Sequence, residues 1–577
     1  MGDENMNAKR LVLVTVVLIL IISQPLLLTV LGKEAENEGS KNYLYDYPRY
    51  QLTNDNQPKF FLDMAVYHNP IDGKDYAVFT YLIPNNDTIV DQLSKKQYEE
   101  DKRPSNSIPT IESRSDFGMF SELTSFTFEM VIASDLLEGG TVDITMQVAS
   151  NVLGFRNPVI VDDDGYVHLT YLSPVYYNAT NEERAFNPGK KLNNHTIRSV
   201  LIYQRYSLEE LLKGNTTPKN NITITTYEKE SVTSDALSYN PKGKNIILTW
   251  SSYMQYTKIT QAVGADIFDF NFFVNSYMVF NNSILDNLAP NQLPAVRYLF
   301  GQNQTSVIPY SFNYRSAYQA IAYIDPSNTT HLLWSWRSVQ GVRNNIYHIT
   351  LSSITPDPKY NFTLTLGEQF EVPVTINDAT AILRRINGFQ WQDNNYISYV
   401  STTYALPYYS PLNVKYPYSK EFPGSLKKDQ VSLDVARKTN EAWVFWSIQI
   451  ETSEQDQPWF YMVMVTIFGT DGTVKQSRIT LTEEVVHIYP NGEFTQDGHL
   501  VLGWIQAYNQ KTPEDPHWIY DLYLVYKPEP PPEQADPVIL LILGILLMTG
   551  ISAGAIFAIQ KFVPKEEKRT EIPMPVE

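Results

Sequence analysis

Residues 155–171 read FRNPVIVDDDGYVHLTY. A short apolar segment leads into an acidic turn that contains Gly165, and a second segment then alternates apolar and polar residues as far as Tyr171. Alternation with a period of two is typical of a strand with one buried face, and Asp and Gly are residues that favour tight turns. The stretch therefore predicts a β-hairpin.

The same pattern recurs along most of the chain, each time as a turn followed by a strand that ends in Trp or Tyr. The other copies are DGKDYAVFTY (72–81), NPKGKNIILTW (240–250), DPSNTTHLLWSW (325–336), DNNYISY (393–399), KTNEAWVFW (438–446) and QDGHLVLGW (496–504). Small antiparallel sheets that repeat in this way can bury their faces only against their neighbours. The repetition predicts an all-β fold, a β-propeller of about seven blades. Six or eight blades stay open, because the strand-like residues 124–134 lie in the widest interval between two copies.

Helix is sparse in this pattern. One short helix is expected at residues 207–213, where Ser207 and Glu210 form a capping box and Gly214 ends the helix. It would lie in a connection between two strands.

The units resemble the blades of sialidase-like propellers with Asp boxes, and residues 155–171 are the nearest local match. No unit has the complete Ser/Thr-x-Asp-x-Gly-x-x-Trp box, so the resemblance supports the architecture rather than an activity. It implies one site residue, because Arg156 stands where the sialidase F/Y-R-x-P motif has an arginine that would hold a substrate carboxylate. The alternative is that Arg156 pairs with carboxylates or carbonyls between blades.

Two apolar segments flank the repeated body. Residues 537–560 carry no charge and, at about 1.5 Å rise per residue, are long enough to cross a hydrocarbon core about 30 Å thick. Basic residues follow this segment, and Lys9 and Arg10 precede the apolar run near the N-terminus, so both ends predict that the body lies outside the cell. The N-terminal run is either cleaved or kept as an anchor, which gives a single-pass or two-pass cell-membrane protein. The expected order is a signal peptide or signal anchor (1–32), an extracellular propeller (41–527), a Pro-rich stalk (528–536), a transmembrane helix (537–560) and a cytoplasmic tail (561–577).

Composition narrows the class of partner. The net charge of −18 makes nucleic acid an unsuitable partner, because phosphate binding needs clustered basic residues. The chain has no cysteine, which excludes disulfides and thiolate metal sites and, together with sequons, is typical of an archaeal-type cell-surface glycoprotein. The glycosylation sequons are at Asn86, Asn178, Asn194, Asn215, Asn221, Asn281, Asn303, Asn328 and Asn361.

Other candidate sites have weaker patterns. A proline-rich, tyrosine-rich segment offers rings that suit stacking on sugars or anchoring a protein, or that pack over blade edges; its tyrosines are Tyr408, Tyr409, Tyr416 and Tyr418. His168 and His331 each lie three residues before an aromatic residue of their strand, which indicates one structural position used twice rather than a metal pair. No metal or cofactor is expected. Gly550 and Gly554 have the GxxxG spacing that would allow two transmembrane helices to dimerise.

These patterns favour a membrane-anchored extracellular propeller that binds glycan or protein at the cell surface without catalysis. A sialidase-like glycoside hydrolase is the enzymatic alternative. A third hypothesis is an accessory subunit of a membrane transporter or surface complex. A fold shared by binders and enzymes cannot separate them.

Overall fold

The computed structural model divides the chain into two compact units, Met1–Lys527 and Pro528–Glu577. The residues that it describes are 47–86, 91, 92, 95, 99, 125–153, 157–177, 196–226, 230–254, 261, 262, 265, 266, 272–300, 315–338, 344–357, 361–372, 383–401, 407–412, 420, 421, 433–450, 460–480, 486–511 and 515–528. The two apolar terminal segments lie outside them. Within the described ranges, no helix has both the length and the apolar character needed to cross a membrane.

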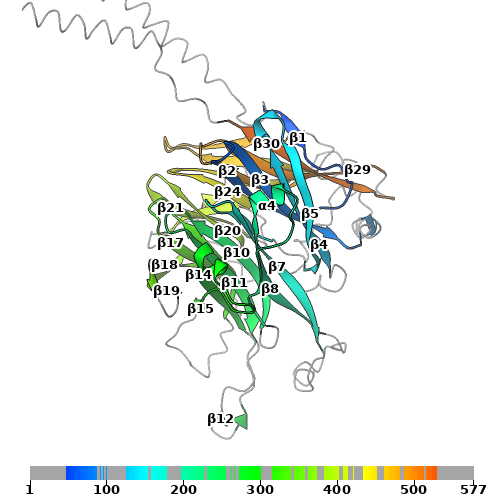
Figure 1. Cartoon of the computed structure of the whole chain (residues 1–577). Helices are drawn as coiled ribbons and strands as arrows, with labels where there is room; N and C mark the ends of the chain where they lie inside the picture. Colours follow the sequence, from blue (N-terminus) through cyan, green and yellow to red (C-terminus); the bar gives the residue numbers. More distant parts are fainter. Residues whose placement is uncertain are drawn as a thin grey trace, which may run out of the picture. The chain divides into compact units, whose positions relative to one another are not determined.

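The described strands form seven four-stranded antiparallel sheets and one two-stranded ribbon (Figure 1). Each four-stranded sheet is a blade, numbered here in chain order. Blade 1 contains β2 (Phe60–Asn69), β3 (Lys74–Pro84), β4 (Phe126–Ser134) and β5 (Thr141–Val152). Blade 2 contains β6 (Val159–Val161), β7 (Tyr166–Tyr177), β8 (Thr196–Ser207) and β9 (Asn220–Thr223). Blade 3 contains β10 (Glu230–Asn240), β11 (Asn245–Met254), β14 (Phe272–Phe280) and β15 (Tyr298–Phe300), and the ribbon is β12 (Gln261–Ala262) with β13 (Ala265–Asp266).

The remaining blades follow the same order. Blade 4 contains β16 (Arg315–Ile324), β17 (Thr330–Ser338), β18 (Asn344–Asp357) and β19 (Asn361–Val372). Blade 5 contains β20 (Leu383–Trp391), β21 (Asn394–Ser401), β22 (Pro407–Pro411) and β23 (Lys420–Glu421). Blade 6 contains β24 (Leu433–Lys438), β25 (Glu441–Ile450), β26 (Phe460–Phe468) and β27 (Val474–Arg478). Blade 7 contains β28 (Val486–Phe494), β29 (Leu500–Asn509), β30 (Trp518–Lys527) and β1 (Arg49–Gln51).

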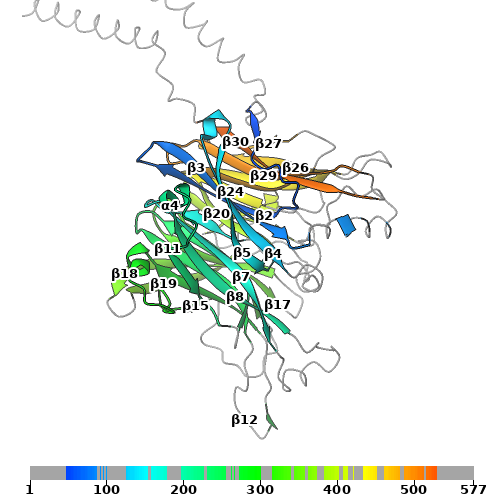
Figure 2. The same ribbon diagram turned by 45° about the vertical axis from the view of Figure 1, so that its right-hand side comes forward.

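The first strands of successive blades contact one another around a closed ring, from β2 through β6, β10, β16, β20 and β24 to β28, which contacts β2 again. Three of these strands, β2, β20 and β24, are labelled in Figure 2. The seven-bladed propeller expected from the sequence is therefore confirmed. The seven repeated segments coincide with the first turn and second strand of the seven blades. The strand-like residues 124–134 form β4, the third strand of blade 1, so the eight-blade alternative is wrong.

The ring closes through the N-terminal strand. β1 pairs antiparallel with β30, with Arg49 opposite Val525 and Gln51 opposite Tyr523, so the first strand of the chain completes the last blade. Leu52 continues the ladder, since its N–H donates to the carbonyl of Leu522 at 2.7 Å. The repeats predict the blades, but β1 has no repeat pattern, and its pairing with β30 joins the beginning of the described body to its end.

In blades 3, 4, 6 and 7, the second strand carries a fully buried tryptophan. Trp250, Trp446 and Trp504 are fully buried at their strand positions. In blade 4 the buried indole is that of Trp334, two residues before the tryptophan at which the sequence pattern ends that unit. Burial of such rings between sheets is the main stabilising contribution in a chain without disulfides.

The propeller has two unlike ends. At the turn end, the first strand of every blade turns directly into the second, for example at residues 70–73 and 495–499. At the opposite loop end, the second strand of each blade leads to the third, and the two longest connections between strands are of this kind, residues 85–125 in blade 1 and 178–195 in blade 2. Both ends of the described body are at the turn end, because Lys527 lies opposite Leu500 at the start of β29, and Arg49 lies opposite Val525.

The expected helix is present as α4 (Leu208–Leu212). Ser207 is its N-cap, and its Oγ accepts a hydrogen bond from the Glu210 N–H at 3.4 Å. Gly214 has a φ of +87°, in the left-handed region that suits glycine after a helix.

Candidate functional site

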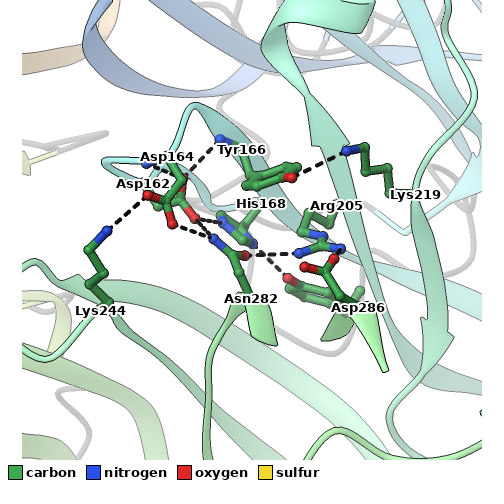
Figure 3. A network of polar contacts seen from close by, with 10 residues as sticks. Asp162, Asp164, Tyr166, His168, Arg205, Lys219, Lys244, Asn282 and Asp286 are labelled. Atoms are coloured by element: carbon green, nitrogen blue, oxygen red, sulfur yellow. Dashed lines mark hydrogen bonds and ion pairs between the residues drawn. The ribbon is translucent and has the colours of Figure 1, made fainter. Parts of the chain in front are cut away.

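A network of polar contacts surrounds the first turn of blade 2 (Figure 3). Oδ1 of Asp162 accepts hydrogen bonds from the backbone N–H groups of Asp164 at 3.0 Å and Tyr166 at 2.9 Å. Its Oδ2 lies 2.9 Å from Nε2 of His168, and Nδ1 of that ring lies 2.6 Å from the hydroxyl of Tyr203. The carboxylate thus orders its own turn and holds a histidine on the following strand.

A side chain of the next blade completes the network. Asn282 is the first residue of α5 (Asn282–Asp286) in blade 3, and its amide donates to Oδ2 of Asp162 at 2.6 Å and to Oδ2 of Asp164 at 3.3 Å. Its oxygen accepts a hydrogen bond from Arg205 at 3.0 Å. One amide therefore joins two carboxylates and a guanidinium across the boundary between blades 2 and 3.

Arg205 is almost completely buried, with 1% of its surface exposed. Its guanidinium lies 4.5 Å from the ring centre of Tyr166 and forms an ion pair with Asp286. The Nζ of Lys219 lies 4.7 Å from the same ring and donates to the tyrosine hydroxyl at 3.2 Å. Stacked and charge-assisted contacts of this kind fix the guanidinium in place.

The protonation states follow from these contacts. Burial acts to raise the pKa of Asp162, but hydrogen bonds from His168, the Tyr166 N–H and Asn282 together hold it below its usual value. Burial lowers the pKa of His168 despite the opposing hydrogen bond to Asp162. At neutral pH the pair is thus a carboxylate with a neutral imidazole. Both ring nitrogens of His168 therefore have hydrogen-bond partners within blade 2.

Blade 4 repeats the same arrangement. Oδ2 of Asp325 lies 3.0 Å from Nε2 of His331, and Nδ1 of this ring lies 2.7 Å from Nε2 of His348, which replaces the tyrosine of blade 2. Again a neighbouring blade supplies an asparagine, since Asn395 of β21 donates to Oδ2 of Asp325 at 3.1 Å. Hydrogen bonds from His331, Ser327 and a backbone N–H overcome the effect of burial and hold the pKa of Asp325 below its usual value.

The histidines were expected from the sequence to share one structural position, and the structure places them so. Their aspartate partners were missed, although both pairs have the spacing Asp-x5-His, Asp162 with His168 and Asp325 with His331. The asparagines come from unrelated positions of the following blades, and no spacing in the sequence indicates them. Within the part of the chain that the structure describes, no group of three or more His, Asp or Glu side chains is arranged to hold a metal ion.

A second set of polar side chains joins the innermost strands. Each contact joins a side chain of one blade to the backbone of the next. Two side-chain amides donate to carbonyls, Asn387 to Leu433 at 3.5 Å and Asn491 to Leu62 at 2.7 Å. Two carboxylates accept from backbone N–H groups, Asp434 from Gly492 at 3.1 Å and Asp63 from Val159 at 3.3 Å. An innermost strand has a free backbone edge toward the axis, and side chains that bond such an edge satisfy groups that would otherwise stay unpaired.

Glu493 belongs to the same region. Its Oε2 accepts a hydrogen bond from the Val66 N–H at 2.8 Å. Burial raises the pKa of Glu493 to about 8, and the nearby carboxylates of Asp434 and Asp63 act in the same direction, while the Val66 N–H and Arg437 oppose it. A carboxyl group that holds its proton near neutral pH is therefore present between blades 7 and 1.

The candidate ligand residues lie in different places. Arg156, Tyr416 and Tyr418 are outside the described residues. Tyr408 lies in β22, and its side chain is not among those described. Tyr409 is buried, with its ring 5.0 Å from that of Phe468 in blade 6 and 6.4 Å from that of Tyr396. The structure therefore does not bring the four tyrosines together as a described surface.

The asparagines of the glycosylation sequons differ in exposure. Asn86, Asn215 and Asn221 are exposed, as a modified asparagine must be. Asn281 and Asn328 are partly buried, and the Asn281 side chain caps α5 by accepting from the Ile284 N–H at 3.0 Å. The side chains of the other sequons, Asn178, Asn194, Asn303 and Asn361, are outside the described set. Glycosylation stays a prediction.

No protein-family model matches the chain, and no curated protein matches it. Among solved structures, it is similar to a PL25 ulvan lyase, a polysaccharide lyase, at 10% identity, with a TM-score of 0.39 over 83% of this chain and 94% of the lyase. A protein of unknown function from Dyadobacter fermentans gives 9% identity and a TM-score of 0.35, over 83% of this chain and 98% of that one.

Trypanosoma rangeli sialidase in complex with sialic acid gives 7% identity and a TM-score of 0.32, over 84% of this chain and 58% of the sialidase. Similarity at these levels does not indicate what the chain binds. The propeller assignment comes from its own seven sheets.

Proposed function

We propose that this protein is a membrane-anchored propeller of the cell surface that binds a glycan or protein partner at its loop end and does not act as an enzyme. The observation that carries the proposal is the division between the two ends of the ring. Both ends of the described body, Arg49 and Lys527, are at the turn end, while the longest connections are at the loop end. A tether at one end and long connections at the other suit a scaffold that displays a binding surface.

The polar network supports a scaffold role. Asp162 and Asp325 each bond a histidine of their own blade and an asparagine of the next, and Asp434 and Asp63 bond backbone groups across blade boundaries. These groups join blade 1 to 2, 2 to 3, 4 to 5 and 6 to 7, and such contacts support a rigid platform. Residues 537–560 would supply the anchor and the −18 net charge the solubility of the external body.

The test uses the full-length protein in phosphatidylcholine vesicles. We expect it to float with the vesicles and to retain glycans or envelope proteins from a panel of immobilised ligands. The Arg156→Ala variant should bind equally well, and neither protein should release the fluorophore from a methylumbelliferyl sialoside. Turnover that is lost in Arg156→Ala would establish the sialidase-like alternative instead.

Two comparisons separate the remaining hypotheses. A variant with Tyr416→Ala and Tyr418→Ala should keep its ligand if the loop end binds it, because the connection that contains these residues leaves β22 at the turn end. A chain that ends at Lys527 should also keep its ligand. Loss of the partner only in this shortened chain would favour the accessory-subunit hypothesis, in which the apolar helix carries the contact.

A further inference from the structure

The large apolar side chains that are most exposed in the described residues lie together at the turn end of blade 1. Ile71, in the turn between β2 and β3, is 86% exposed, and Leu137, between β4 and β5, is 65% exposed. Single exposed apolar residues are common on protein surfaces and need no explanation. Ile71 and Leu137 do need an explanation, because both lie beside the strands at which the described body begins and ends.

The two turns are held side by side. Nζ of Lys74, which follows the first turn, lies 2.8 Å from Oδ1 of Asp135, which begins the second. The short helix η2 (Leu136–Glu138) presents Leu137 outward while Leu136 is buried beneath it. Ile71 and Leu137, called the tips below, therefore project from two turns that are joined to each other rather than from independent loops.

This surface adjoins the strands through which the chain enters and leaves the body. A Cβ built on Gly139 would lie 2.8 Å from the ring of Tyr50 in β1, and one on Gly140 would lie 3.0 Å from Leu524 in β30. Both glycines have positive φ, so the turn approaches these strands as closely as only glycine permits. Across the same boundary, the hydroxyl of Tyr526 donates to Asp75 at 3.0 Å.

We propose that Ile71 and Leu137 insert into the interface of the lipid bilayer and hold the turn end of the propeller against the membrane. This inference rests on the proposed membrane anchoring. The apolar segment that begins at residue 537 follows Lys527 by only a short proline-rich stretch. In polyproline geometry, at about 3.1 Å per residue, residues 528–536 would span about 30 Å, so an anchor at residue 537 would keep the end of β30 within about that distance of the hydrocarbon core.

The charges around the tips specify the kind of lipid. Asp72 and Glu138 are exposed beside them, and Asp497 lies across the boundary in blade 7 with 62% of its side chain exposed. An acidic surrounding is repelled by anionic headgroups. The tips therefore suit a neutral or zwitterionic surface, with affinity from the two apolar side chains rather than from charge. Contact at this end directs the loop end away from the membrane.

The absence of native cysteine makes the experiment direct. Single variants Ile71→Cys, Leu137→Cys and Lys511→Cys are labelled with a nitrobenzoxadiazole fluorophore in the full-length protein and reconstituted into phosphatidylcholine vesicles. Lys511 is exposed at the loop end and is the matched control. Lipids with a nitroxide near the headgroup should quench the labels at 71 and 137 at least about twofold and leave the label at 511 unchanged.

A further pair of variants separates tip insertion from simple proximity. A label at Glu138→Cys should be quenched in the otherwise unchanged chain and lose that quenching when Ile71→Ser and Leu137→Ser are added, with an unchanged near-ultraviolet circular dichroism spectrum as proof of folding. Equal quenching with and without the tips would overturn the inference. So would vesicle-bound protein in which labels at 71, 137 and 511 are all unquenched. Protein that fails to float with the vesicles would instead refute the anchoring itself, and the inference with it.

Discussion

The amide of Asn282 in blade 3 donates a hydrogen bond to the carboxylate of Asp162 in blade 2 at 2.6 Å. The two residues are far apart in the chain, and both lie at the turn end of the ring, Asp162 in the first turn of blade 2 and Asn282 in α5. Asn395 and Asp325 make the equivalent contact between blades 5 and 4. A carboxylate that orders its own turn also fixes the next blade, so local turn structure and ring assembly depend on the same atoms.

The first prediction concerns this contact. Asn282→Ala removes the donor to Asp162 and the acceptor for Arg205, so the buried carboxylate and the buried guanidinium each lose one hydrogen bond. We expect the free energy of unfolding to fall by about 2 kcal/mol. Denaturant unfolding of the full-length protein measures it, with exposed Asn215→Ala as the control, expected within about 0.5 kcal/mol of the parent. Equal effects in the two variants would show that the contact contributes nothing.

The second prediction concerns the close packing of blades 6 and 7. A Cβ at Gly492 would lie 2.2 Å from the ring of Phe445, which is fully buried. Gly492→Ala should therefore destabilise the protein by about 1–3 kcal/mol through overpacking. Phe445→Leu in the same chain should restore part of this loss, and a double-mutant cycle measures the coupling.

Gly73→Ala is the matched control for that cycle. No atom lies within 4 Å of a Cβ built on Gly73, so only its φ of +68° opposes the substitution. Its cost, about 1 kcal/mol, should not change when Phe445→Leu is added. If Phe445→Leu changed the cost of both glycine variants equally, the steric explanation would be wrong.

The third prediction concerns acid. Burial lowers the pKa of His487 to about 3, and its Nδ1 accepts a hydrogen bond from the Trp504 indole at 3.1 Å. Between pH 6.5 and about 3 the unfolded chain binds a proton that the folded protein excludes, so stability falls as the pH falls through this window. The slope from this residue is roughly 1.4 kcal/mol per pH unit.

His487→Gln keeps an acceptor for the indole and should remove that slope. The measurement is the free energy of unfolding at several pH values from 4 to 7. His517→Gln, at an exposed histidine, serves as the control and should leave the slope intact. Identical pH profiles for parent and His487→Gln would contradict the assignment.

The fourth prediction has the opposite sign. Glu493 has a folded pKa of about 8 against an ordinary value of 4.5, mainly because of burial. Between these pH values the folded protein holds a proton that the unfolded chain has released, so stability is full below pH 4.5 and is lost as the pH rises through about 8. Glu493→Gln retains an oxygen for the Val66 N–H without the charge.

We expect Glu493→Gln to be more stable than the parent at pH 8.5 by about 2 kcal/mol and to have no advantage at pH 4.5. Denaturant titrations at the two pH values test this, with exposed Glu138→Gln as the control. A constant difference across pH would mean that the effect is one of packing rather than of ionisation.

Much of the fold could be predicted because its signals are local. The alternation of apolar and polar residues and the Asp, Asn and Gly turns identify the first turn and second strand of every blade, and Ser207 with Gly214 identifies α4. The candidate site was harder to predict from the sequence. The Asp-x5-His spacing was present in two units, but the asparagines that complete each network come from a helix in one blade and a strand in another.

The amino-acid sequence by itself determined the all-β architecture and the seven repeated units, because the period of a strand and the residues of a turn depend on near neighbours in the chain. Only the tertiary structure decided that β1 completes blade 7, that Trp334 fills the core of blade 4 and that both ends of the body share the turn end. These features depend on contacts between residues that belong to different strands and are far apart in the chain. They exist only once the ring has closed and neighbouring blades compete for the same space and hydrogen bonds.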